Sequence, residues 1–192
     1  MMRKIAVFGL PGTGKTTLAL RLAGLLGVPC HDLDRILFTS DGRPLPLEEF
    51  RARTAALTET GGWVIDGNYS KLADVTWHRA DAVIWLDYPL PLIVSRVTRR
   101  NLRRLTGREP APHGAVGWKR AFFSKKSVLA NAVRKYLRNR SRYADQLAET
   151  TQLGVGVLRF RTPGQAGQWL ATIESRSALS PGPSEPWPSR HR

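Results

Sequence analysis

The stretch GLPGTGKT occupies residues 9–16 and satisfies the pattern G-x-x-x-x-G-K-[ST]. An apolar run at residues 5–8 precedes it and predicts a buried strand. Leucines recur after it at positions 18, 22, 25 and 26, which predicts a helix with one apolar face that stops at Gly27. A strand, a glycine-rich loop and a helix in this order form the context that a phosphate-binding loop requires.

The glycines of this loop would let successive backbone N–H groups turn towards a phosphate, because a side chain would restrict φ and block the approach. Lys15 would reach the β- and γ-phosphates of ATP or GTP, and the Thr16 hydroxyl would bind Mg²⁺. The alternative is a glycine-rich turn before an ordinary helix. We therefore expect a site for ATP and Mg²⁺ that includes Gly9, Pro11, Gly12, Thr13, Gly14, Lys15, Thr16 and Thr17.

Strands and helices are predicted to alternate along the rest of the chain, which is typical of an α/β fold of the P-loop NTPase type. We expect a parallel five-stranded sheet with helices on both faces and right-handed crossovers. The predicted strands are 5–9, 28–33, 63–66, 82–87 and 155–160. The predicted helices are 15–26, 47–60, 70–79, 90–105, 118–149 and 163–174.

Carboxylates follow several of these strands, at the edge of a parallel sheet where ligands bind. Asp66 is the leading candidate to hold Mg²⁺ through water, and Asp87 is its rival. Each could instead be a helix cap or a turn residue. Asp32 and Asp34 could position an acceptor hydroxyl or take its proton, although Asp34 could equally cap a helix. We expect these four side chains to share one crevice with Gly9.

Basic residues are concentrated in one segment. The net charge is +15, and residues 96–142 alone contain 15 Lys and Arg residues against one acidic residue. Arginines without acidic neighbours favour an anionic partner. A basic lid at about 101–142, built around a loop at 107–118, could close over a nucleotide and exclude water. Candidate lid contacts are Arg104, Arg108, Arg134, Arg138 and Arg142.

The same basic segment also allows a second interpretation. Aromatic residues alternate with Lys and Arg in it, at Trp118, Phe122, Phe123 and Tyr136. This pattern is typical of nucleic-acid binding through residues 96–142. A nucleotide-regulated nucleic-acid-binding protein is therefore the alternative to an enzyme.

Composition sets the remaining limits. A chain of 192 residues fits one α/β domain, predicted at 1–175, and a Ser- and Pro-rich disordered tail at 176–192. Cys30 is the only cysteine, so no disulfide forms within the chain. The apolar run after Met1 is too short for a signal peptide, and no run is long enough to span a membrane. We expect a cytoplasmic protein that does not bind membranes.

Four further segments, HDLD at 31–34, WVIDGNY at 63–69, RADAVIWLDYP at 79–89 and the arginine-rich helix after it, accompany the P-loop. Together they resemble the adenylate-kinase-like P-loop kinases, and within them the bacterial topology modulation (FlaR-like) protein family. The resemblance covers residues 3 to about 174. It implies that Asp66 assists Mg²⁺, that Arg96 stacks on adenine and that Arg100 contacts phosphate.

The segment after Asp66 lacks the arginine with which adenylate kinases grip a monophosphate, so the resemblance does not extend to AMP as acceptor. The first functional hypothesis is an ATP-dependent phosphotransferase, a kinase, that acts on a small-molecule acceptor. Its acceptor would be bound by Asp32, Asp34, Arg35, Gly67 and Asn68. Its catalytic residues would be Lys15, Asp34, Arg100 and Arg104.

Overall fold

The computed structural model describes residues 2–39, 41–105 and 128–179, with only the backbone described at 101, 104, 105, 128–139 and 177–179. Five strands form one sheet in the order β2-β3-β1-β4-β5. All neighbouring strands are parallel, which confirms the predicted sheet. The strands are β1 (Lys4–Gly9), β2 (Cys30–Asp32), β3 (Trp63–Asp66), β4 (Ala82–Leu86) and β5 (Gly156–Phe160).

The helices at 15–26 and 90–105 have the predicted boundaries, the other predicted α-helices differ in theirs, and the helix Leu33–Leu37 was not predicted. The α-helices are α1 (Lys15–Leu26), α2 (Leu33–Leu37), α3 (Leu47–Thr58), α4 (Leu90–Leu105), α6 (Val128–Gln152) and α7 (Pro163–Leu179). The segment 70–79 contains two short 3-10 helices, Ser70–Leu72 and Trp77–Arg79, instead of the predicted α-helix. Helix α7 extends into the first residues of the predicted tail, and residues 180–192 lie outside the described residues.

Strand β2 is shorter than predicted because a helix begins directly after it. Asp32 Oδ1 accepts a hydrogen bond from the backbone N–H of Asp34, 2.9 Å away, and so caps α2. The cap is therefore Asp32 and not Asp34, which leaves the Asp34 side chain available for another contact.

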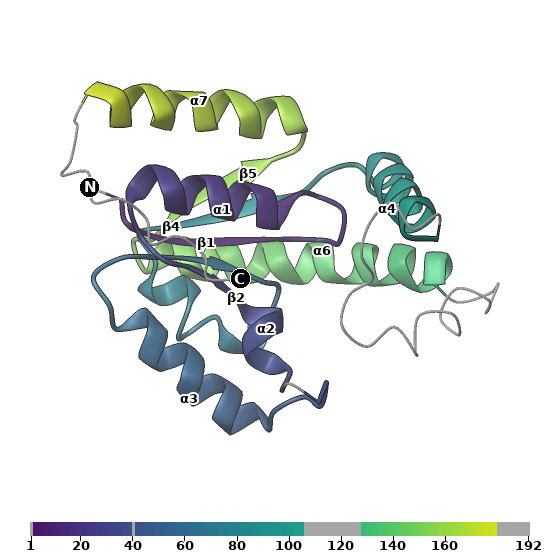
Figure 1. Ribbon diagram of the computed structural model, residues 1–192, viewed down its shortest axis with the longest axis horizontal. Helices are drawn as coiled ribbons and strands as arrows, with labels where there is room; N and C mark the ends of the chain where they lie inside the picture. The colour runs from purple at the N-terminus through teal and green to yellow at the C-terminus, as the bar shows by residue number, and fades with distance from the viewer. Residues whose placement is uncertain (1, 40, 106–127, 180–192) are drawn as a thin grey trace, which may run out of the picture.

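Alternation along β1 divides the core into two layers. Ile5 and Val7 pack with α1 and α7 on one face of the sheet, whereas Ala6 and Phe8 pack with α3 and α6 on the other. Successive side chains of a strand point to opposite faces, so a central strand covered on both sides is apolar throughout. Figure 1 shows α1 and α7 together on one side of the sheet and α6 on the other.

Strand order determines what lies beside the glycine-rich loop. Strand β1, which leads into the loop, is central, with β3 and then β2 on one side and β4 and then β5 on the other. The carboxylates after β2 and β3 therefore lie on the opposite side of the loop from Asp87, which follows β4. Within the described residues, no helix is both long and apolar enough to cross a membrane.

Candidate nucleotide and acceptor site

The P-loop (residues 9–16) adopts the backbone conformation that its glycines permit. Gly12 has φ +89°, and a Cβ there would lie 2.8 Å from Val97 Cγ2 and 3.3 Å from the Ile93 carbonyl oxygen. Gly9 approaches the next strand equally closely, since a Cβ would lie 2.8 Å from the Leu86 carbonyl oxygen. Any larger residue at these positions would separate the loop from α4 or from β4.

Polar contacts also hold the loop in place. Thr13 is buried, and its Oγ1 donates a hydrogen bond of 2.8 Å to the Leu10 carbonyl. Arg96 Nη1 on α4 donates to the Thr13 carbonyl at 3.3 Å, and the Arg96 guanidinium lies 5.8 Å from the centre of the Tyr88 ring. The structure therefore places Arg96 directly against the P-loop, where the resemblance predicted a nucleotide contact.

Thr16 and Asp66 are brought together at the carboxyl end of the parallel pair β1 and β3. Thr16 Oγ1 donates a hydrogen bond of 2.5 Å to Asp66 Oδ2. Asp66 is only 4% exposed, and its Oδ1 has no hydrogen-bond partner among the described residues. Burial raises the pKa of Asp66, and the charges of Asp32 and Asp34 add to this, whereas the Thr16 hydrogen bond and Lys15 oppose it.

This arrangement fits magnesium. Mg²⁺ prefers oxygen ligands and keeps several waters, so it needs few protein groups. Thr16 offers a hydroxyl, and Asp66 offers a buried carboxylate oxygen that has no hydrogen-bond partner among the described residues. The described residues contain no group of three or more His, Cys, Asp or Glu side chains that could hold a metal ion. Phosphate and water would have to supply the remaining ligands.

The predicted acceptor residues lie beyond Asp66, at the ends of β2 and β3. Asp34 is exposed and its Oδ1 accepts a hydrogen bond from the Tyr69 hydroxyl. Arg35 is 89% exposed on its side chain and lies 3.8 Å from Asp32. The structure thus brings Asp34 close to the end of β3, and it adds Tyr69, which sequence reasoning did not select.

Gly67 and Asn68 connect the acceptor side to α6. A Cβ at Gly67 would lie 2.7 Å from Leu33 Cβ, so the chain passes tightly under α2. The Asn68 side chain hydrogen-bonds Tyr143 of α6, and Asn68 Oδ1 is buried without a partner among the described residues. Burial raises the pKa of Tyr143 despite this hydrogen bond. An unpaired buried amide oxygen can accept a hydrogen bond from a ligand hydroxyl.

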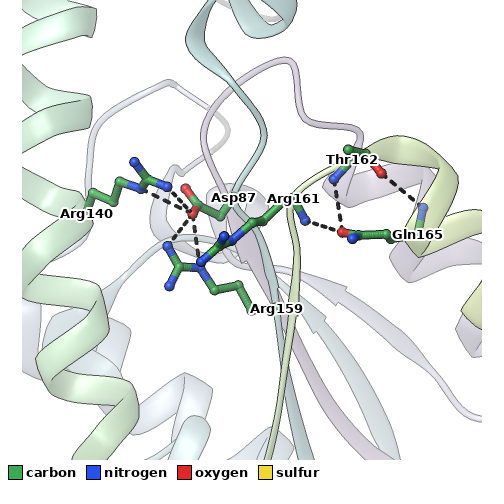
Figure 2. A network of polar contacts seen from close by, with 6 residues as sticks. All are labelled: Asp87, Arg140, Arg159, Arg161, Thr162 and Gln165. Atoms are coloured by element: carbon green, nitrogen blue, oxygen red, sulfur yellow. Dashed lines mark hydrogen bonds and ion pairs between the residues drawn. The ribbon is translucent and has the colours of Figure 1, made fainter.

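Asp87 lies on the other side of the P-loop and contacts two arginines (Figure 2). Its side chain is 1% exposed, and Oδ2 accepts from Arg159 of β5 at 2.5 Å and from Arg140 of α6 at 3.0 Å. Arg159 also lies over the Trp85 ring, 4.2 Å from its centre. Asp87 is thus an ion-pair partner that joins the sheet to α6, a role that sequence reasoning did not consider.

We expect Asp87→Asn to lower the free energy of unfolding by about 2 kcal/mol, because Arg140 and Arg159 would lose the negative charge that both contact. Loss of a fully buried partner costs about 3–5 kcal/mol, and the partial exposure of both arginines reduces this. Urea denaturation of the full chain measures the change. Asp74→Asn is the control, since its pair with Arg51 is exposed and should contribute less than about 1 kcal/mol. Equal losses in the two variants would contradict the assignment.

The single cysteine, Cys30, lies close to Asp32 and Asp66. Burial, together with the charges of Asp66 and Asp32, raises the pKa of Cys30 from 9.0 to about 11. The neutral thiol is favoured in the folded state, so its contribution to stability is complete below pH 9 and is lost as the pH rises through 11. At pH 8 we expect iodoacetamide to alkylate folded protein roughly a hundredfold more slowly than urea-unfolded protein. Equal rates would show that the folded thiol ionises normally.

The arginines predicted to contact the nucleotide or to belong to the lid differ in their exposure. Arg100 lies half-buried on α4, one turn beyond Arg96, whereas Arg142 on α6 is exposed. Arg140, two residues earlier on α6, faces the sheet instead, and only its contact with Asp87 reveals this. Arg108 and the side chains of Arg104, Arg134 and Arg138 lie outside the described residues, as does most of the predicted lid.

Comparison with known proteins identifies the fold. No model of a known protein family matches the chain, and no curated protein matches it. The chain is similar to the solved structure of shikimate kinase from Acinetobacter baumannii in complex with shikimate, with 18% identity and a TM-score of 0.55 over 94% of this chain and 96% of that one. A shikimate kinase from Bacteroides thetaiotaomicron gives 17% identity and a TM-score of 0.56 over 93% and 100%. The fold is therefore that of the P-loop kinases, whereas the narrower topology modulation family is not shown.

Proposed function

We propose that this chain is a kinase that transfers the γ-phosphoryl group of ATP to a hydroxyl group of a small molecule. The observation that carries the proposal is the row of groups at one edge of the sheet. Lys15 and Thr16 on the P-loop are followed by Asp66 and then by Asp34, which is exposed and close to the end of β3. A phosphate donor bound by the P-loop would then lie on the same side of the sheet as a proton acceptor.

The fold comparison supports a kinase, since the two solved structures described above are named as shikimate kinases. Shikimate is the compound bound in one of them, and it is not transferred to this chain, because the identity is only 18%. The proposal specifies the acceptor only as a compound with a hydroxyl group.

In the proposed reaction, backbone N–H groups of the P-loop hold the phosphates, and Lys15 offsets the charge on the β- and γ-phosphates. Asp34 takes the proton of the acceptor hydroxyl as its oxygen attacks the γ-phosphorus. The bond to the bridging oxygen breaks and ADP leaves, while the proton passes from Asp34 to solvent. Mg²⁺, when held by Thr16 and Asp66, would neutralise phosphate charge. Arg96 and Arg100 would contact the nucleotide from α4.

The test is formation of ADP by the purified chain with ATP and Mg²⁺ against a panel of sugars, polyols, nucleosides and other hydroxylated metabolites. We expect at least one compound to raise ADP formation well above basal hydrolysis. No stimulation by any member of a broad panel would contradict the proposed function.

The nucleic-acid hypothesis stays a prediction from sequence. Its aromatic residues Trp118, Phe122 and Phe123 lie outside the described residues, as does the side chain of Tyr136. Neither structural comparison supports it. Duplex binding that weakens steeply with salt would favour it over the kinase.

A further inference from the structure

Asp34 is held by contacts from two directions, although it is exposed. Its backbone N–H donates to Asp32 Oδ1 at 2.9 Å, which fixes the first turn of α2. Its Oδ1 accepts from the Tyr69 hydroxyl, which follows β3. Within the part of the chain that the structure describes, Oδ2 makes no hydrogen bond or ion pair. The two oxygens of this carboxylate are therefore not equivalent in the structure.

Tyr69 is itself held rigidly. Its ring packs edge-on against Phe50 of α3, with the ring centres 5.1 Å apart at 79°, and Phe50 is 2% exposed. Two rotatable bonds and a buried neighbour leave the hydroxyl little freedom, so its position is set by α3 and β3 and not by solvent. Asn68, the residue before it, is anchored to Tyr143 of α6.

We propose that Tyr69 is a positioning residue for the phosphoryl transfer: its hydroxyl fixes the Asp34 carboxylate so that Oδ2 is presented to the acceptor hydroxyl. This inference rests on the proposed function, since it assigns Asp34 as the proton acceptor. A carboxylate that rotates freely about its last bond offers either oxygen, whereas one with a held Oδ1 offers the other in a fixed direction.

Tyr69 keeps the proton that this hydrogen bond needs. The pKa of Tyr69 is raised by burial and by its bond to Asp34, so this group remains a donor at neutral pH.

The variant that tests the inference is Tyr69→Phe, which keeps the ring and its contact with Phe50 and removes only the hydroxyl. Turnover is measured in the full chain with an acceptor found by the panel, and ATP binding is measured separately by calorimetry. We expect kcat to fall about tenfold in Tyr69→Phe while the Kd for ATP stays nearly unchanged, because the carboxylate is no longer oriented. The matched comparison adds Tyr69→Phe to Asp34→Asn, where it should lower kcat no further, because the hydroxyl then has no carboxylate to position.

A kcat of Tyr69→Phe equal to that of the unmodified chain would overturn the inference. A similar tenfold fall in the Asp34→Asn background would also overturn it, because the hydroxyl would then act independently of the carboxylate. Absence of turnover by the unmodified chain with every acceptor would refute the kinase instead. Equal thermal midpoints of Tyr69→Phe and the unmodified chain exclude misfolding as the cause.

Discussion

Replacement of Lys15 by alanine should reduce acceptor-dependent ADP formation by about a hundredfold to a thousandfold. The structure places Lys15 at the start of α1, directly after the positive-φ residue Gly14, with its charge close to Asp66. Developing charge on the transferred phosphoryl group would lose its nearest cation, and fixed charges in such sites contribute about 3–4 kcal/mol each to the barrier. The measurement is kcat/KM with saturating Mg²⁺.

Lys4→Ala is the control for this experiment, because Lys4 lies at the amino end of β1 and the P-loop follows its carboxyl end. Its activity should match that of the unmodified chain. Retention of full activity by Lys15→Ala would show that the P-loop lysine does not take part in the reaction. Loss of activity in both variants would indicate general instability.

Asp34→Asn is expected to lower kcat by about a hundredfold to ten-thousandfold while leaving the Kd for ATP nearly unchanged. An amide has almost the shape of a carboxylate and cannot take a proton, and Asp34 lies on the side of Asp66 away from β1. Separate measurement of nucleotide binding, by calorimetry, and of turnover distinguishes these two effects.

Asp41→Asn provides the matched comparison, since Asp41 is an exposed carboxylate on the turn after α2 that pairs with Arg43. It should leave both kcat and ATP affinity unaltered. If Asp34→Asn turned over at the normal rate, another group would have to be the proton acceptor. The proposed role of Tyr69 in positioning Asp34 for catalysis would then be wrong.

The strands and most helices could be predicted from local patterns, because buried parallel strands are apolar runs and α1 and α4 carry clear helical spacing. The segment 70–79 could not, since its apolar residues Leu72, Val75 and Trp77 fill the core under α6 without forming a regular helix. Burial in an irregular segment leaves the same sequence signal as a short helix.

Asp34 and Asp87 illustrate the limit for site residues. Each follows or ends an apolar run before a turn, so the sequence assigns both to one edge of the sheet. Their difference depends on their neighbours in space: Asp87 contacts Arg159 across a strand pair and Arg140 from α6, whereas the Asp34 carboxylate accepts a hydrogen bond from Tyr69 and stays exposed.

The sequence by itself determined the P-loop, the parallel α/β fold and the set of carboxylates at the strand ends, because each of these leaves a pattern among residues close together in the chain. The tertiary structure alone decided which carboxylate faces Thr16, which is held by arginines and which Tyr69 holds. Those roles depend on strand order and on helix packing between residues 35 to 72 positions apart, which no local pattern encodes.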